Sequence, residues 1–343
     1  LPRRWRVQAA PQTGPAARPV PDRRATPDAV LRIRDPEGRT ARLDLVIRRR
    51  LEPNDAWMLL QRATARAGTK DPPAMSFVVA QYLGPRTRDL LAGRDVGYAD
   101  TTGNIRLALD RPAIFLLVPG ADRDPSPDSR PARSLRGPSA GRAVRALLDF
   151  SPPFGVRQLA ERSGVSAPTL SRVIDLLVRD AVARRDSPRG PVTSVDWQAL
   201  LRRWTQDYSL VGSNRTAAYL EPRGLDQLWS RLKDAGFQYA LTASAVAAHL
   251  APVAAPRLAV LYVVNAAAVA DQLALRSADT GGNVMLAEPF DRVVFERTVV
   301  RDGLVHAALT QVAADLLTAP GRGPAEAEAL IDWMAANESA WHA

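Results

Sequence analysis

The chain of 343 residues contains no cysteine, and this absence excludes several kinds of chemistry. Without thiols there is no disulfide framework, no cysteine-based metal site and no thiol nucleophile. Histidine is also scarce, because His249, His306 and His342 are the only three, and no two of them have the spacing of metal ligands. We therefore expect neither a bound metal nor another cofactor.

Long apolar runs are missing as well. No stretch approaches the roughly 20 consecutive apolar residues that a membrane-spanning helix needs. The arginine-rich opening lacks the apolar core of a secretory signal. We therefore expect a soluble, cytoplasmic protein that does not contact a membrane.

Lysine occurs only at Lys70 and Lys233, so arginine carries nearly all of the positive charge. The formal net charge of +10 is unevenly spread. Residues 1–129 carry 22 basic and 15 acidic groups, residues 130–205 carry 14 and 6, and residues 206–343 carry 10 and 15. A GC-rich genome produces an arginine bias by itself but explains this asymmetry less well. A positive field over the first two thirds attracts polyanions such as nucleic acids.

The most informative stretch is residues 155–196. Its apolar residues repeat with helical spacing at Leu170, Val173, Ile174 and Leu177. In the preceding segment, Gly164 permits a tight turn and Ser166 is a suitable cap for the next helix. Pro168 falls in the first helical turn, where its missing N–H costs nothing. The pattern predicts a helix-turn-helix whose recognition helix spans residues 167–180.

A hairpin is predicted next, with strands over residues 181–185 and 191–195 around a turn. A hairpin directly after a recognition helix is the wing of a winged helix. The residues expected at the DNA are Ser166, Ala167, Thr169, Ser171 and Arg172 on the helix, and Arg184, Arg185 and Arg189 on the wing. The helix would enter a groove, and the wing arginines would contact phosphates or the minor groove. The alternative is a winged helix that mediates only protein contacts.

Two further regions precede this stretch. Residues 1–28 are rich in proline and arginine, which predicts a flexible basic arm. Residues 29–118 alternate between strand and helix patterns, which predicts a small α/β domain. Its expected strands are residues 30–34, 42–47, 76–80, 105–109 and 114–118, and its expected helices are 53–66 and 85–92. Residues 119–140 hold almost no apolar side chain, which predicts a linker.

A nuclease is the alternative hypothesis for the α/β domain. Restriction-endonuclease-like folds hold Mg²⁺ with carboxylates and a lysine, and Asp44 and Asp100 have plausible positions for this. The required acid-x-lysine pattern is absent, because Lys70 follows Gly68 and Thr69 in a predicted loop. Asp100 is explained more simply as part of a turn. We therefore favour an inactive platform, either degenerate restriction-endonuclease-like or merely α/β.

Residues 141–210 then form the expected winged-helix domain, closed by a helix over residues 197–208, and residues 211–343 form a third, α/β domain. Its expected strands are residues 216–220, 237–242, 258–264, 283–287 and 294–295, and its helices 224–236, 243–250, 266–275, 304–317 and 324–340. The outline is that of a degenerate nucleotidyltransferase. The strand over residues 258–264 has no carboxylate for Mg²⁺, so we expect no catalysis. Ser244 is then a helix cap and His249 an ordinary helix-face residue.

Loose motifs in this half suggest a family. They are residues 239–247 (YALTASAVA) before an apolar strand, residues 283–284 with 288–291 (EPFD), and residues 311–317 (QVAADLL) with 321–323 (GRG). Together they resemble the C-terminal half of AbiEi-type regulators, over roughly residues 140–340. The resemblance implies an antitoxin and transcriptional regulator of a type IV toxin–antitoxin system, with a cognate toxin as partner. The family's short forms lack a domain like residues 29–118.

These observations lead to one expectation of function. We expect a sequence-specific, DNA-binding transcriptional regulator that binds double-stranded DNA through its winged helix and is not an enzyme. The flanking domains would serve assembly, as a homodimer, or sensing. The alternatives are a nucleic-acid-processing or defence enzyme with a restriction-endonuclease-like N-terminal domain, and an antitoxin that acts mainly by protein contact.

Overall fold

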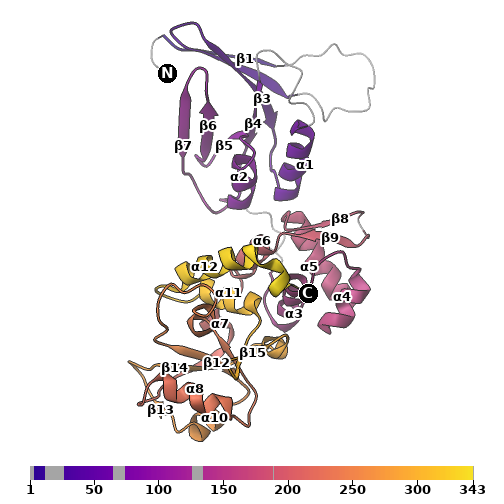
Figure 1. Ribbon diagram of the computed structural model, residues 1–343. Helices are drawn as coiled ribbons and strands as arrows, with labels where there is room; N and C mark the ends of the chain where they lie inside the picture. Colours follow the sequence, from indigo (N-terminus) through magenta and orange to yellow (C-terminus); the bar gives the residue numbers. More distant parts are fainter. Residues whose placement is uncertain (1–3, 12–26, 65–73, 126–133, 188, 343) are drawn as a thin grey trace. The chain divides into compact units, whose positions relative to one another are not determined.

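Figure 1 shows the computed structural model, which describes residues 4–11, 27–64, 74–125, 134–187 and 189–342. The chain divides into two compact units, Leu1–Pro131 with Arg179–Ala181, and Ala132–Val178 with Val182–Ala343. Each unit contains a 7-stranded sheet together with helices, so the expected mixed α/β class is confirmed. Among the described residues, no helix has both the length and the apolar composition needed to cross a bilayer.

The first unit is a curled sheet whose strands follow one another in chain order. The strands are β1 (Arg6–Pro11), β2 (Ala29–Arg34), β3 (Thr40–Ile47), β4 (Ala74–Ala80), β5 (Gly97–Asp100), β6 (Ile105–Leu109) and β7 (Ile114–Val118). Strands β3, β4 and β5 are parallel, and the other neighbours are antiparallel. Helices α1 (Pro53–Thr64) and α2 (Pro85–Ala92) make the two parallel crossovers. Because both crossovers step in the same direction, both helices lie on one face of the sheet (Figure 1).

Strand β1 corrects the expectation of a flexible arm over residues 1–28. It pairs with β2 along its whole length, from Arg6 opposite Arg34 to Pro11 opposite Ala29. Trp5, just before the strand, packs against a small core around Ile33. A proline at the end of an edge strand costs no ladder hydrogen bond, so Pro11 does not prevent the pairing. The remaining proline-rich residues of the expected arm, 12–26, lie outside the described residues.

The turn between β5 and β6 has the structure expected of it. Asp100 accepts hydrogen bonds from the backbone N (2.9 Å) and Oγ1 (2.6 Å) of Thr102, and Gly103 has a φ of 96°. Asn104 then binds the chain that follows β7, with its Oδ1 2.8 Å from Gly120 N and its Nδ2 3.0 Å from Ala121 O. The first residues of the predicted 119–140 linker therefore pack against the first unit.

The second unit begins with helices and a hairpin that we call the α3–β9 module. It consists of α3 (Pro138–Asp149), α4 (Val156–Ser163), α5 (Ala167–Arg179), β8 (Ala183–Arg185) and β9 (Val192–Val195). Gly164 ends α4 in the left-handed conformation, with φ 60° and ψ 21°, as the predicted turn requires. Helix α3 begins inside the predicted 119–140 linker, because Gly137 adopts a φ of 86° and Pro138 takes the first helical position. The predicted 119–140 linker is therefore shortened at its C-terminal end as well as at its N-terminal end.

The rest of the second unit is built on a sheet of order β13-β10-β14-β12-β11-β16-β15. Its strands are β10 (Arg215–Leu220), β11 (Tyr239–Thr242), β12 (Ala259–Val263), β13 (Arg276–Ser277), β14 (Val284–Glu288), β15 (Val299–Arg301) and β16 (Leu304–His306). Its helices are α6 (Trp197–Trp204), α7 (Leu210–Ser213), α8 (Leu225–Lys233), α9 (Ser244–Ala247), α10 (Ala266–Gln272), α11 (Leu309–Leu317) and α12 (Gly323–Ala336), with short 3₁₀ turns η1 (Arg292–Phe295) and η2 (Glu338–Ala340).

Two predicted elements in this part are wrong. Residues 294–295 lie in η1 instead of a strand, because the Asp291 side chain accepts a hydrogen bond from Val293 N (3.0 Å) and caps the turn. The helix expected over residues 304–317 is split. Its first residues form β16, which pairs with β11 and, through a hairpin with Gly303 at φ 78°, with β15. Long-range pairing outweighs the local helical pattern there.

One hydrophobic core runs through the whole second unit. Leu147 of α3, Leu201 and Trp204 of α6, and Leu316 of α11 are all buried in it. The boundary expected between residues 210 and 211 therefore does not separate two cores. The α3–β9 module and the C-terminal sheet form one compact body.

Candidate nucleic-acid interface

The first turn of α5 brings several predicted residues together. Ser166 Oγ donates to Thr169 Oγ1 over 3.0 Å, and Arg172 Nη2 donates to the same oxygen over 3.3 Å. Arg172 Nε also donates to Pro168 O at 3.2 Å. Ser166 and Arg172 are exposed and Thr169 is half-buried. These contacts hold a hydroxyl–guanidinium cluster (Ser166, Thr169, Arg172) at the exposed start of a helix.

Ser166 was expected to cap α5 with its side chain. Its carbonyl does accept the first helical hydrogen bond, from Leu170 N at 3.0 Å. Its hydroxyl is committed to Thr169, as described above. Ala167 and Ser171 are half-buried and one helical turn apart, so they flank the cluster and do not form its centre.

Arg185 does not have the position expected of a phosphate contact. Its side chain is only 6% exposed, and its Nη1 lies 2.9 Å from Asp175 Oδ1 on α5. Successive side chains of a strand point to opposite faces, so β8 directs Arg184 outward and Arg185 toward α5. Arg185 therefore holds the hairpin to the helix and neutralises an exposed carboxylate next to the cluster.

The other hairpin arginines do lie at its surface. Arg184 on β8 and Arg189 in the turn are both exposed. Within the hairpin, Thr193 Oγ1 of β9 donates to Arg184 O of β8 at 3.4 Å. The turn is closed by Gly190 N donating to Ser187 O at 3.0 Å.

The sequence analysis did not name two further arginines of the α3–β9 module, Arg157 and Arg142. Arg157 lies exposed in the first turn of α4. Arg142 of α3 directs Nη1 to Gly164 O at 3.4 Å, across the turn that precedes α5. The sequence could have indicated Arg157, because it is a basic residue at the start of the helix that precedes the Gly164 turn. The contact of Arg142 is non-local, so no pattern in the sequence indicated it.

Arg145 was also missed, and it connects the module to the rest of the unit. Its side chain is fully buried (0% exposed), with Nη2 2.9 Å from Asp149 Oδ2 on the next turn of α3. Nη1 donates to Gln311 Oε1 of α11 at 3.1 Å. Thr310 of α11 donates to Asp149 from the other side. These contacts fix the orientation of α3 on α11.

The polar network continues beyond Gln311 to Asp315. Asp315 is fully buried and accepts hydrogen bonds from Tyr208 Oη (2.6 Å), Thr242 Oγ1 (2.6 Å) and Gln311 Nε2 (2.9 Å). Burial raises the pKa of Asp315, although these hydrogen bonds favour its charged form. Burial and the nearby Asp315 raise the pKa of Tyr208 well above its usual value. Asp315 thus joins Tyr208, Thr242 and Gln311, which belong to separate segments of the chain, inside the core of the second unit.

The residues weighed for catalysis have structural partners. Ser244 does not cap α9 but donates to Glu326 of α12, and the His249 ring lies tilted by 33° against His306 with 5.5 Å between ring centroids. Asp44 accepts from Arg42 Nε at 2.8 Å, while Asp100 organises its turn. Within the described part of the chain, no group of three or more His, Cys, Asp or Glu side chains is arranged to hold a metal. Lys70 lies outside the described residues.

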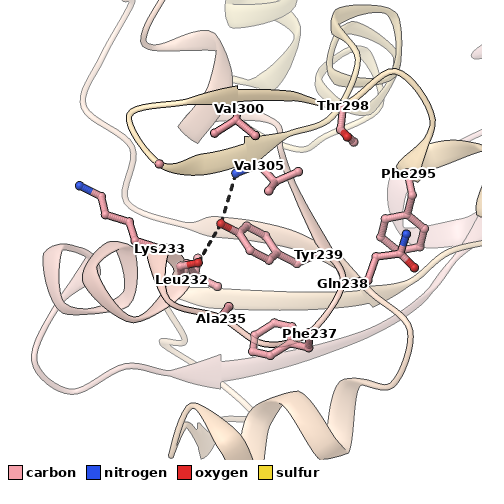
Figure 2. Close-up of a pocket in the computed structure, with 11 residues that line it drawn as sticks. Leu232, Lys233, Ala235, Phe237, Gln238, Tyr239, Phe295, Thr298, Val300 and Val305 are labelled. Atoms are coloured by element: carbon pink, nitrogen blue, oxygen red, sulfur yellow. Dashed lines mark hydrogen bonds between the residues drawn. The ribbon is translucent and has the colours of Figure 1, made fainter.

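A cavity of about 290 Å³ lies between α8, β11 and the β15–β16 hairpin (Figure 2). Its walls are mainly apolar, and Lys233 and Gln238 are its exposed polar lining residues. Tyr239 Oη donates to Leu232 O (3.0 Å) and accepts from Val305 N (3.2 Å), so the phenol is occupied in holding the hairpin. The cavity therefore brings no nucleophile and base together.

A comparison of the chain with protein-family models, curated proteins and solved structures found no match. The resemblance to AbiEi-type regulators therefore stays a prediction.

Proposed function

We propose that this chain is a sequence-specific regulator of transcription that binds duplex DNA through a winged helix formed by the α3–β9 module. The observation that carries the proposal is the cluster of Ser166, Thr169 and Arg172 at the exposed start of α5. In helix-turn-helix proteins the recognition helix lies in the major groove with its N-terminal residues at the base edges. The cluster occupies that position on α5.

The chemistry of the cluster suits a base edge. An arginine fork pairs with O6 and N7 of guanine, and serine or threonine hydroxyls hydrogen-bond to either kind of base. The Arg172 guanidinium donates to Pro168 O and Thr169 Oγ1 on the preceding helical turn, which orients it before any DNA is bound. A preoriented side chain loses less entropy on binding. Arg184 and Arg189 then supply phosphate contacts from the hairpin.

Selection of bound sequences from a random duplex library tests the proposal directly. We expect a consensus, and we expect Arg172→Ala to cost about 1–3 kcal/mol and to relax the preference at one base position. The matched control is Arg257→Ala, which removes an exposed arginine from a loop of the second unit and should leave the consensus unchanged. Failure to select any consensus, or equal effects of the two substitutions, would refute the assignment of α5.

We also propose that the C-terminal sheet is non-catalytic and serves assembly as a homodimer. Its edge strand β15 carries Val299 and Val300, which are 59% and 68% exposed. An exposed apolar edge strand is a template for pairing with a second chain. Pairing two readers matches a palindromic operator. The relation to AbiEi-type regulators belongs to the same proposal, and co-purification with the product of a neighbouring gene tests for a cognate toxin.

A further inference from the structure

Strands β1, β2 and β3 gather arginines on one face of the first unit's sheet. The register places Arg6 opposite Arg34, and Arg32 opposite Arg42. Because alternate residues of a strand share a face, all four side chains lie on the same side of the sheet. We call these four residues the arginine face. The alternate residues Leu31, Ile33 and Leu43 lie on the opposite side and pack into a core there.

The arginine face is open to solvent. Arg6, Arg32 and Arg34 are exposed, so neither helix of the unit covers them. Arg42 is half-buried and pairs through Nε with Asp44 at 2.8 Å. Among the residues that the structure describes, Arg6, Arg32 and Arg34 have no ion pair or hydrogen bond through their side chains. The face therefore keeps a surplus of positive charge.

This arrangement is unfavourable for the sheet by itself. Side chains directly opposite each other on antiparallel strands have Cβ atoms about 4.5–5.5 Å apart, and like charges at this distance destabilise the pair. The arginine face contains two such pairs, Arg6 with Arg34 and Arg32 with Arg42. Only the Arg42 side is compensated, by Asp44. Genome composition explains a choice of arginine over lysine, but it does not explain four arginines on one face of three neighbouring strands.

A bound polyanion relieves this repulsion, and the composition of the face indicates which one. The arginines recur at about 5 Å between strands and about 7 Å along a strand, so several phosphates of one backbone are within reach together. The neighbouring outward residues, Gln8 and Thr40, are polar, and no aromatic side chain stands at the outward positions of β1–β3. Proteins that hold single strands stack the bases on aromatic rings. The face therefore suits a duplex, whose bases are already stacked.

We propose that the arginine face binds the sugar–phosphate backbone of duplex DNA, as a second, sequence-independent contact surface in the first unit. This inference does not rest on base recognition by α5. It assigns a binding role to a sheet face that the sequence analysis treated as part of an inactive platform.

The test uses the full chain with the triple substitution Arg6→Gln/Arg32→Gln/Arg34→Gln. The control, Arg257→Gln/Arg276→Gln/Arg322→Gln, removes the same charge from exposed positions of the second unit. Affinity for a duplex of arbitrary sequence is measured over a range of salt concentrations. Each lost phosphate contact lowers the slope of log K against log salt by about 0.9, so we expect a reduction of about 2–3 in the triple variant and none in the control. A slope equal to that of the wild type would overturn the proposal.

Two further measurements separate the explanations. Thermal unfolding should show no loss of stability in the triple variant, because it removes repulsion between exposed side chains; a lower midpoint would mean that the arginines serve the fold. A single-stranded probe of equal length should lose less affinity than the duplex, and an equal or larger loss would refute the assignment to duplex DNA. If library selection yields no consensus while the slope still falls, base recognition by α5 fails and the arginine face stands.

Discussion

Replacing Arg145 by methionine tests whether the buried polar network holds the α3–β9 module in place. The substitution keeps much of the side-chain volume but leaves the Asp149 carboxylate buried without its cation. It also removes the donor to Gln311 Oε1. Removing one partner of a buried ion pair costs about 3–5 kcal/mol, because the remaining charge is uncompensated. For a unit of this size that cost lowers the unfolding midpoint by about 6–20 °C.

Arg202 and Glu328 provide a matched control within the same unit. Arg202 Nη1 lies 2.6 Å from Glu328 Oε1, and the two side chains are 47% and 50% exposed. Hydrogen bonding to Glu328 raises the pKa of Arg202, but solvent screens such a pair. We expect Arg202→Met to cost at most about 1 kcal/mol. The two pairs differ in burial, and Arg145 and Asp149 have further hydrogen bonds to Gln311 and Thr310 of α11, so the difference in cost reports burial together with this network.

The assay is thermal and urea unfolding monitored through tryptophan fluorescence, because Trp197 and Trp204 are buried in the core of the second unit. The double variant Arg145→Met/Asp149→Leu removes both charges, and it should be more stable than the sum of the single effects predicts by at least about 1 kcal/mol. It should not return to wild-type stability, because Thr310 and Gln311 lose partners. If Arg145→Met costs no more than Arg202→Met, the network does not anchor α3.

Three other predictions concern pH, the hairpin and assembly. Burial lowers the pKa of His306 to about 4, below its ordinary value. Between these two pKa values a proton binds to this histidine in the unfolded chain but not in the folded one, so the free energy of unfolding should fall by about 2 kcal/mol from about pH 7 to about pH 5. Urea unfolding at the two pH values should show that His306→Leu lacks this decrease. Arg185→Ala uncovers the charge of Asp175 beside the hydroxyl–guanidinium cluster and should weaken the affinity for all DNA duplexes. The double variant Arg185→Ala/Asp175→Ala should recover this affinity when it is titrated with duplex DNA, and no recovery would contradict the role given to Arg185. Light scattering should show that Val300→Lys converts dimers to monomers and that Val253→Lys, at a 50% exposed loop position, does not. Equal masses for the two variants would mean that β15 does not form the dimer interface.

Short-range patterns determined the elements of the α3–β9 module. Helical spacing of Leu170, Val173 and Ile174, a glycine where φ is 60° and a proline after the turn are all local signals. Their physical causes act within a few residues, so the sequence predicted the turn and α5 closely. The same applies to the Asp100 turn, whose hydrogen bonds close within four residues. The exposed start of α5 followed from these local rules.

Only the tertiary structure decided what depends on contacts between distant residues. Arg185 looks like Arg184 in the sequence, but the pleat of β8 turns it toward Asp175. Arg145 looks like a surface arginine until α11 covers it with Gln311. Strand β1 forms because it pairs with β2, and this pairing completes the arginine face. No local pattern in the sequence relates the residues of β1 to their partners in β2. Burial, pairing register and charge compensation are properties of the assembled chain, so the anchor of the module and the second basic surface had to be found in three dimensions.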